Sequence, residues 1–510
     1  MVMSETSAEH EAGLDSPGGR DRRQLIGLWA GLVLAMGLQF IPVPVELVAI
    51  TGSAGEARSA WIVLSLLLLM ACWWVSEAIP IPVTSLLPLV VLPFFSVQSI
   101  RQTSGDYFHP IVVLLLGGFI VAKAIERWNL HERIALGVVV RMGASPGRLI
   151  AGFMLAAAIL SMWISNTATS IMMMPIAVSV ALAVTDGRTG GRGFTFALLL
   201  GIAYACSIGG LGTYIGTPTN LLIKDALEGA TGREIDFVSW MMLGVPAVIL
   251  LLPIAWFVLT RWAFKVSIDD TSAGQAVIAD RLAALGPVTI PERRTIMVFG
   301  LIASLWIFGR PLRGLEVGGI MPFAGLTDHV TAIFGVVLCF LVPSGSRREP
   351  GSSLLDWKTA ESIPWGVVLL FGGGMALAGA IRGSGLGDWV GSELEIFAAL
   401  PALLVILLVA TLVIFVTEVT SNIATAAALT PVLISLADRT DLDPVLLGAP
   451  VALAASCAFM LPMATGPNAV VFATDKVSLP TMARAGVRLN LLAIFAITGV
   501  SYVIAPLAFG

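Results

Sequence analysis

Two nearly identical polar motifs interrupt the most apolar parts of this sequence, and they constrain its fold more than any other feature. Residues 165–175 read SNTATSIMMMP and residues 421–431 read SNIATAAALTP, an offset of 256 (421 minus 165). Each motif lies inside an apolar region, 149–184 or 401–437, that is about twice as long as one short membrane span. Polar groups at membrane depth are tolerated only where protein or a water-filled cavity satisfies them. Each region is therefore predicted to be a re-entrant helical hairpin with its polar turn in such a cavity.

The composition places the chain in a membrane. Hydrophobic residues make up 57% of the 510 residues and charged residues only 12%, whereas about 25% of the residues in a soluble domain are charged. The net charge of −4 and the lack of a long basic run argue against a nucleic-acid partner. The four cysteines lie singly in apolar stretches, which favours buried thiols over a disulfide framework or a zinc site.

Apolar segments long enough to cross a bilayer recur along the chain. A span needs roughly 20 apolar residues, and the candidates are 24–42, 59–79, 82–97, 109–128, 194–210, 239–262, 294–311, 325–344, 364–382, 445–461 and 489–508. The predicted fold is all-α and polytopic, with about eleven transmembrane helices and two re-entrant hairpins. Lys and Arg gather in alternate loops, which puts the N-terminus in the cytoplasm and the C-terminus outside. We expect a multi-pass protein of the cell membrane, specifically of a bacterial inner membrane.

The chain contains an internal repeat. Segment 117–130 resembles segment 373–386 with the same offset of 256, and GTPTN at 216–220 resembles ATGPN at 464–468 with an offset of 248. Each unit combines an odd number of spans with one hairpin, so the second copy is inverted, and inverted repeats with broken helices are typical of secondary transporters. The predicted divisions are a disordered cytoplasmic tail (1–23), a first transmembrane helix with an outer loop (24–58), repeat 1 (59–265), a cytoplasmic linker (266–293) and repeat 2 (294–510), with broken helices at 194–227 and 445–475.

The hairpin turns are suited to ion binding. A turn at membrane depth leaves free N–H groups at the start of the returning helix, which Ser, Thr and Asn can cap. Those N–H groups and the helix dipole can hold an anion without Lys or Arg, while carbonyl and side-chain oxygens suit a small cation such as sodium. For one motif alone, hydrogen bonding between spans is an equally good explanation.

The motifs GTPTN and ATGPN interrupt apolar spans with Gly, Pro and Asn. They predict that each of these spans unwinds midway, because proline lacks a backbone donor and glycine permits unusual dihedral angles. An ordinary proline kink is the alternative. Two hairpin turns and two breaks, paired by an internal repeat, favour a functional site.

These motifs resemble those of the divalent anion/sodium symporter family, whose members carry dicarboxylates, citrate and sulfate. The resemblance rests on TEVTSNIATAAALTP, IGGLGTYIGTPTNLL and MLPMATGPNAVVF together with the first SNT motif, and it extends over nearly the whole chain from the second span onward. It implies a homodimer in which a scaffold holds a mobile transport domain that moves as an elevator.

The resemblance also implies two sodium sites and one substrate site. One sodium site would use Ser161, Ser165, Asn166 and Gly216, and the other would use Thr417, Thr420, Asn422 and Ala464. The substrate would contact Ser165, Asn166, Thr167, Thr217, Pro218, Ser421, Asn422 and Thr465. Ser161 and Thr417 share the offset of 256, which supports the assignment independently. Two residues depart from the family pattern: Ile423 replaces a threonine, which we interpret as tuning substrate choice, and Gly466 replaces a proline.

Charged residues near the membrane need an interpretation of their own. Glu418 could bind a cation, exchange a proton or cap backbone groups at the hairpin turn. The structural role is favoured, because the sodium sites are complete without this carboxylate. Residues Glu126, Arg127, His131 and Arg133 are predicted to form the solvated face of an interfacial helix.

The predicted function is sodium-coupled symport of a small dianionic carboxylate, with a C4-dicarboxylate such as succinate, malate or fumarate expected. The expected partners are two or more sodium ions, the small anion, the lipid bilayer and a second copy of the chain. An anion/anion exchanger and a carrier of sulfate, a sulfonate or citrate are alternatives, and a channel is a more distant one. An intramembrane enzyme is disfavoured, because the sequence offers no metal-ligand cluster or nucleophile–base pair.

Overall fold

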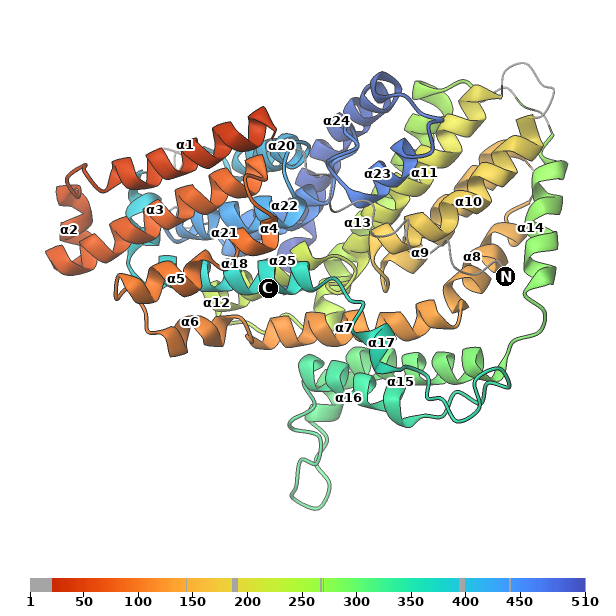
Figure 1. Ribbon diagram of the computed structural model, residues 1–510, viewed down its shortest axis with the longest axis horizontal. Helices are drawn as coiled ribbons and strands as arrows, with labels where there is room; N and C mark the ends of the chain where they lie inside the picture. The colour runs from red at the N-terminus through yellow and green to blue at the C-terminus, as the bar shows by residue number, and fades with distance from the viewer. Residues whose placement is uncertain are drawn as a thin grey trace.

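The structure is a computed structural model that describes residues 21–143, 145–185, 191–266, 268, 270–393, 400–439 and 442–509. Regular secondary structure in these ranges is helical, apart from isolated bridges between Val317 and Ile320 and between Pro343 and Ser353. The predicted all-α fold is confirmed. Of the predicted tail, residues 1–23, the part up to residue 20 lies outside the described ranges. Figure 1 shows an elongated molecule, with α1 to α3 toward one end and α8, α10 and α14 toward the other.

The first part of the chain runs from α1 to η2. Its helices are α1 Arg22–Leu38, α2 Val45–Thr51, α3 Ala54–Ser76, α4 Ile81–Thr84, α5 Leu87–Phe94, α6 Ile100–Asp106, α7 Pro110–Arg127, α8 Leu130–Arg141, α9 Pro146–Ser161, α10 Asn166–Thr185, α11 Arg192–Gly209, the 3-10 turn η1 Gly210–Gly212, α12 Pro218–Thr231, α13 Phe237–Phe257 and the π-helical turn η2 Val258–Ala263. The remaining helices are α14 Ser272–Ala284, α15 Ile290–Arg313, α16 Asp328–Leu341, α17 Trp357–Ala360, α18 Trp365–Gly383, α19 Leu386–Glu393, α20 Ala402–Thr417, α21 Asn422–Arg439, α22 Pro444–Ala455, α23 Gly466–Phe472, α24 Leu479–Val503 and α25 Ala505–Phe509.

Eight helical segments in the described part of the chain are long and apolar enough to span a membrane. They are Ala54–Ser76, Ile100–Arg127, Asn166–Thr185, Arg192–Gly212, Phe237–Ala263, Ile290–Arg313, Trp365–Gly383 and Leu479–Val503. Other predicted spans form shorter helices: 24–42 forms α1, 82–97 forms α4 and α5, and 445–461 forms α22. The chain is a multi-pass membrane protein, and the number of eleven spans stays a prediction.

Both predicted hairpins and both predicted breaks fall at helix boundaries. Residues 162–165 separate α9 from α10, and residues 418–421 separate α20 from α21. The second helix of each broken pair begins at Pro218 in α12 and at Gly466 in α23. A proline near the start of a helix costs little, because the N–H it lacks would be unpaired there in any case. The starts of α10 and α21 are therefore separated by the repeat offset of 256, and the starts of α12 and α23 by the offset of 248.

The two repeats interlock through their broken helices. The second half of the first broken helix, α12, packs against α21 and α22 of repeat 2. The second half of the other broken helix, α23, packs against α10 and α11 of repeat 1. In Figure 1, α23 lies beside α11, while α12 lies toward α18 and α21. This exchange brings the polar motifs of the two repeats into one region.

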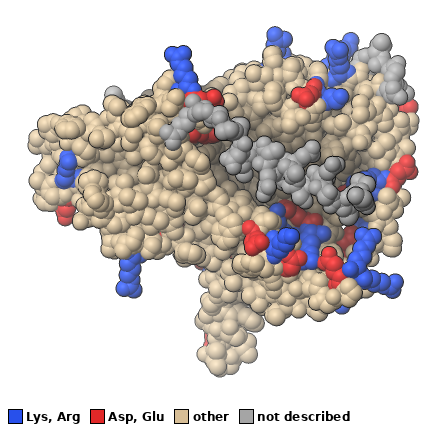
Figure 2. Space-filling model, viewed as in Figure 1, with Lys and Arg blue, Asp and Glu red and all other residues tan. Residues whose placement is uncertain are grey.

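The charged residues around α8 are not a solvated face, so that prediction was wrong. The Arg127 guanidinium lies 2.7 Å from Glu349, and Arg133 Nε lies 2.7 Å from Glu292. His131 is only 8% exposed. The pairing partners come from α15 and from the connection that precedes α17. The periodicity of one helix in the sequence does not reveal such partners in distant segments. Figure 2 shows side chains of both signs close together on the right of the visible face, and few charges on its left part.

Candidate functional site

One cavity of about 670 Å³ brings the two polar motifs and the two breaks together. It lies where α10, α12, α21 and α23 begin. Every residue predicted to contact the substrate lines it: Ser165, Asn166, Thr167, Thr217, Pro218, Ser421, Asn422 and Thr465. The same holds for most of the predicted sodium ligands: Ser165, Asn166, Gly216, Thr420, Asn422 and Ala464. The other two, Ser161 and Thr417, end α9 and α20 and are fully buried.

The two hairpin tips present equivalent helix starts to the cavity. Thr169 N donates to Ser165 O, and Thr425 N donates to Ser421 O, at 2.9 Å in both cases. The N–H groups that precede these bonds have no acceptor within their own helices. The positive ends of α10 and α21 therefore meet at one cavity, and each can hold one carboxylate group of a dianion.

Each break is braced by the asparagine that ends its motif. Asn220 Nδ2 donates to Gly210 O at 3.0 Å and to Thr213 O at 2.9 Å. Asn468 Nδ2 donates to the two corresponding carbonyl oxygens of the second break, at 3.1 Å each. These contacts were not predicted, although the shared last letter of GTPTN and ATGPN was a signal for them. They fix the unwound backbone that passes beside the predicted sodium sites.

The first predicted sodium site contains oxygen atoms without hydrogen-bond partners. Ser161 Oγ and Asn166 Oδ1 are buried and make no hydrogen bond with any described residue. Backbone carbonyls also converge at Gly216, where an added Cβ would lie 2.6 Å from Gly210 O and 2.9 Å from Ser161 O. Buried acceptors without a donor are costly. This group of oxygens therefore fits a sodium ion.

The second predicted sodium site has the same kind of donors, but they bond to one another. Thr417 Oγ1 lies 2.7 Å from Asn422 Oδ1 and 3.0 Å from Ala455 O. Thr420 Oγ1 donates to Val416 O at 2.9 Å. A set of oxygens alone suits sodium, and the described residues contain no cluster of three or more His, Cys, Asp or Glu side chains that would suit a transition metal. Each hydroxyl donates its hydrogen in these bonds and keeps its oxygen lone pairs for an ion.

Glu418 ties the second hairpin to the second break. Its carboxylate accepts hydrogen bonds from Phe459 N at 2.7 Å, from Met460 N at 2.9 Å and from Leu461 N at 3.1 Å. Asn490 Nδ2 of α24 donates to the same carboxylate at 2.7 Å. The side chain thus caps backbone groups that unwinding leaves free, which is the structural role favoured from the sequence. The capped groups belong to the break, however, and not to the hairpin turn.

One part of the cavity wall comes from the start of α1 and the end of α3. It consists of Asp21, Arg23, Ser76 and Glu77. Arg23 Nη2 donates to Val75 O at 2.6 Å and to Val419 O at 3.1 Å, so α1 touches the tip of the second hairpin. Arg23 is the one Lys or Arg among the described lining residues. An anion deeper in the cavity would therefore be held by N–H and hydroxyl groups and by bound sodium.

Ion pairs join α12 and the chain that follows it to the start of α7 and to α15. Asp225 lies within α12, while Glu234 and Asp236 follow its end. The pairs are His109 with Asp225 at 3.4 Å, Arg313 with Glu234 at 2.7 Å and Arg310 with Asp236 at 3.6 Å. The His109 pair is an ion pair only when the imidazole is protonated. These contacts link the broken helix of repeat 1 to helices outside the two hairpins.

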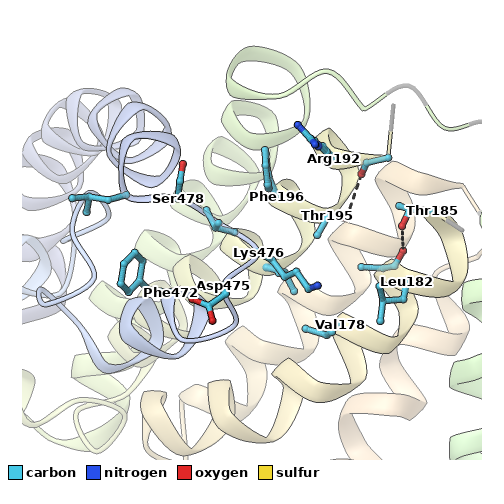
Figure 3. Close-up of a pocket in the computed structure, with 15 residues that line it drawn as sticks. Val178, Leu182, Thr185, Arg192, Thr195, Phe196, Phe472, Asp475, Lys476 and Ser478 are labelled. Carbon is cyan, nitrogen blue, oxygen red and sulfur yellow. Dashed lines mark hydrogen bonds between the residues drawn. The ribbon is translucent and has the colours of Figure 1, made fainter. Parts of the chain in front are cut away.

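A second cavity, of about 1020 Å³, lies between α10, α11 and the connection from α23 to α24 (Figure 3). It is larger than the first cavity, but it contains none of the residues predicted for sodium or substrate. Size therefore does not single out the cavity in which the repeated motifs converge.

Comparison with known proteins relates the chain to membrane carriers. Residues 24–507 match the family described as "Sodium:sulfate symporter transmembrane region". A protein of Staphylococcus saprophyticus named sodium-dependent dicarboxylate transporter SdcS is 41% identical over 454 residues, which covers 88% of this chain and 86% of that protein. A protein with the same name from Staphylococcus aureus strain MRSA252 is 40% identical over 455 residues, with the same coverage.

Two solved structures share the fold at low sequence identity. The YdaH transporter of Alcanivorax borkumensis aligns with a TM-score of 0.52 and 15% identity, covering 88% of this chain and 97% of its own. MtrF of Neisseria gonorrhoeae aligns with a TM-score of 0.56 and 14% identity, covering 79% of this chain and 83% of its own. At this level of identity the likeness concerns the fold alone.

Proposed function

Because the chain belongs to the sodium:sulfate symporter family, the divalent anion/sodium symporters that its motifs resemble, we propose that it imports a small dianionic carboxylate together with sodium. The family and the relatives are transporters, so the chain is a transporter and not an enzyme. The relatives are named sodium-dependent dicarboxylate transporters, which supports both sodium coupling and a dicarboxylate substrate. A C4-dicarboxylate such as succinate, malate or fumarate is the expected cargo.

The meeting of two helix starts in one cavity is the observation that carries this proposal. α10 and α21 begin at the motif asparagines on two sides of the same space. A short dianion with a carboxylate at each end can bridge them, with Ser, Asn and Thr groups completing the contacts. Sodium ions bound beside the tips would add the positive charge that the cavity lacks. Sodium and anion would then raise each other's affinity, which is the coupling that symport requires.

We further propose that the hairpins and broken helices move as one unit. This unit comprises α9 to α13 and α20 to α24, and the scaffold comprises α1 to α8 and α15 to α19, in a homodimer. The cavity reaches the start of α1, which the predicted orientation puts on the cytoplasmic side, and we propose that it opens there. The ion pairs beyond α12 would hold the other side together. The arrangement corresponds to the inward-open stage of an elevator cycle.

Uptake of radiolabelled succinate into proteoliposomes tests the proposal. We expect accumulation with an inward sodium gradient and none when potassium replaces sodium at the same concentration. Uptake that is unaffected by removing sodium would contradict symport. Uptake that depends on preloaded internal anion, with or without sodium, would favour the exchanger. Displacement of succinate by sulfate more readily than by any dicarboxylate would overturn the substrate but leave sodium coupling intact.

The motif asparagines provide the matching variants. We expect Asn166→Ala and Asn422→Ala each to abolish sodium-dependent succinate binding, because each removes an oxygen ligand at a helix start. Ser179→Ala and Ser435→Ala are suitable controls, since these residues lie further along α10 and α21 at equivalent positions and outside the cavity. Normal binding by both asparagine variants would contradict the site assignment.

A further inference from the structure

The cavity in Figure 3 is separate from the transport site. Its walls are α10 from Val178 onward, the first turns of α11, and residues 472–479 around the connection from α23 to α24. Along α10, Val178 lies about 18 Å from Asn166 at a helical rise of about 1.5 Å per residue. A ligand here would not contact the polar motifs at the helix starts.

Three candidate membrane spans end at this cavity. They are Asn166–Thr185, Arg192–Gly212 and Leu479–Val503, and the ends Thr185, Arg192 and Leu479 all line it. The ends of spans mark the level where the hydrocarbon of a bilayer gives way to lipid headgroups. The cavity therefore lies at headgroup level, with its α10 and α11 walls leading toward the hydrocarbon.

Two cationic side chains stand at the cavity on different elements. Arg192 begins α11, and Lys476 belongs to the connection between α23 and α24. In Figure 3 the Lys476 side chain extends across the groove toward α10, and Arg192 lies above it. Neither forms an ion pair with a carboxylate in the described part of the chain. Asp475 is the one acidic residue among the described lining residues, so this described part of the lining has a net positive charge.

The rest of the lining is largely apolar and poorly covered. Leu182 is 55% exposed, Phe472 43% and Leu479 44%. Val178 and Phe196 continue the apolar surface along α10 and α11. Large apolar side chains exposed next to unpaired cations suit a ligand with an anionic head and an apolar tail, and they do not suit a small polar ion alone.

We propose that this groove binds an anionic phospholipid. Its phosphate lies between Arg192 and Lys476, and an acyl chain lies over Leu182 and Phe472. Basic pockets between membrane helices recognise anionic headgroups by this combination of charge and level. The starts of α11, with 18 residues, and α24, with 25, face the same space, and their free N–H groups add to the attraction for phosphate. The bound lipid joins α10 and α11 to the α23–α24 connection.

The test compares the thermal unfolding of the full-length protein in nanodiscs of phosphatidylglycerol and of phosphatidylcholine. We expect phosphatidylglycerol to raise the unfolding temperature by roughly 5 °C, as binding to the folded state alone does at saturating ligand. The double variant Arg192→Gln/Lys476→Gln should lose this difference. The matched control is Arg347→Gln/Arg348→Gln, which removes two exposed arginines elsewhere and should keep it.

Native mass spectrometry of the same variants provides an independent count of retained lipid. Phosphatidylglycerol retained by the wild type and the control but not by the Arg192/Lys476 variant supports the proposal. An equal shift and equal retention in all three proteins would overturn it. Inorganic phosphate or glycerol phosphate that reproduces the full shift would also overturn it, because the ligand would then be a soluble anion and not a lipid.

Discussion

The two halves of the cavity lined by the repeated motifs share a backbone framework but use their side chains differently. In both halves a helix starts at the motif asparagine, and a second asparagine braces the break. In the first half, Ser161 Oγ and Asn166 Oδ1 lack hydrogen-bond partners. In the second half, Thr417 and Asn422 bond to each other. The framework therefore sets where the oxygens lie, while the side chains decide whether those oxygens bond to one another or have no partner among the described residues.

The contact between hairpin and break also differs between the halves. In the first half, the break supplies the side chain, and Thr213 Oγ1 donates to the backbone oxygen of Met162 in the hairpin tip. In the second half, the hairpin supplies it, and Glu418 accepts from the backbone of the break. Met162 and Glu418 are equivalent by the offset of 256 (418 minus 162). A polar link is thus present at this joint in both halves, but opposite partners supply its side chain.

A third difference concerns the contact between one repeat's hairpin and the other repeat's break. An added Cβ at Gly466 would lie 2.0 Å from Thr167 Oγ1, so the glycine leaves room for the threonine hydroxyl. Pro218 is the equivalent of Gly466, and Ile423 is the equivalent of Thr167. All four residues line the cavity. One side of the cavity thus presents a hydroxyl where the other presents a branched apolar chain.

Gly216→Ala should give the largest effect, because it changes the half in which Ser161 Oγ and Asn166 Oδ1 have no hydrogen-bond partner among the described residues. The new Cβ would collide with the backbone oxygens of Gly210 and Ser161, which cannot turn aside as side chains can. We expect sodium-driven succinate uptake in proteoliposomes to fall roughly a hundredfold, which corresponds to about 2.7 kcal/mol. Its equivalent, Ala464, already has a Cβ, so Ala464→Gly is the matched control and should keep most of the uptake. Equal losses in the two variants would contradict the asymmetry.

Glu418→Gln tests the hairpin-to-break link of the second half. The amide keeps the size of the side chain but presents an NH₂ group to backbone donors and loses the charge. Leaving buried donors unsatisfied costs about 1–3 kcal/mol, so we expect a lower unfolding temperature and uptake reduced roughly tenfold. Thr213→Val removes the corresponding link of the first half and should be milder, because a neutral hydrogen bond contributes about 1 kcal/mol. A greater loss for Thr213→Val would reverse this ranking.

Gly466→Ala tests the contact that only one side of the cavity makes. The added methyl group must displace Thr167, and overpacking of this kind costs about 1–3 kcal/mol. We expect the KM for succinate to rise roughly tenfold. The double variant Gly466→Ala/Thr167→Ala should recover much of the loss, since it removes the hydroxyl that meets the new carbon. Gly499→Ala, at a glycine with open space around it, should leave KM unchanged. Strictly additive effects of the two substitutions would show that they do not act through this contact.

Ile423→Thr should have the smallest effect. It makes the second triplet match the first and adds one hydroxyl to the apolar side of the cavity. A single neutral hydrogen bond contributes about 0.5–1.5 kcal/mol, so we expect a change of roughly threefold in the ratio of KM values for hydroxylated and plain C4-dicarboxylates, with malate favoured. Competition of malate and succinate for uptake measures it. A ratio equal to that of the wild type would show that Ile423 does not tune substrate choice.

The sequence predicted the framework because it repeats. The motifs at Asn166 and Asn422 mark both helix starts, and a fixed offset requires no knowledge of packing. The number of spans was less accessible, because residues such as those of α4 and α5 are apolar enough for a span yet turn between Thr84 and Leu87. The length and hydropathy of a segment indicate whether it could span a membrane, but its packing against neighbouring helices decides whether it does.

The details of the site depended on contacts between distant segments. Glu418 meets Asn490 of α24, and Arg23 reaches the tip of the second hairpin. Neither pair has a periodicity or spacing that would reveal it in one sequence. The sequence indicated Thr167 and Gly466 separately and did not predict their contact. That contact joins the hairpin of one repeat to the break of the other. Such crossed contacts follow from the exchange of α12 and α23, which only the fold displays.

The ion pairs beyond α12 make the side of the molecule where the segment after α12 meets α15 sensitive to ionic strength. Arg310 is 74% exposed and Glu234 is 58% exposed, so dissolved ions reach both pairs. Exposed pairs contribute at most about 1 kcal/mol each, and at 0.15 M salt charges are screened over about 8 Å. Any added salt therefore loosens this side, and sodium chloride does so in addition to supplying the coupled ion. A rise of transport rate with sodium contains both effects, and choline chloride at equal ionic strength measures the loosening by salt alone.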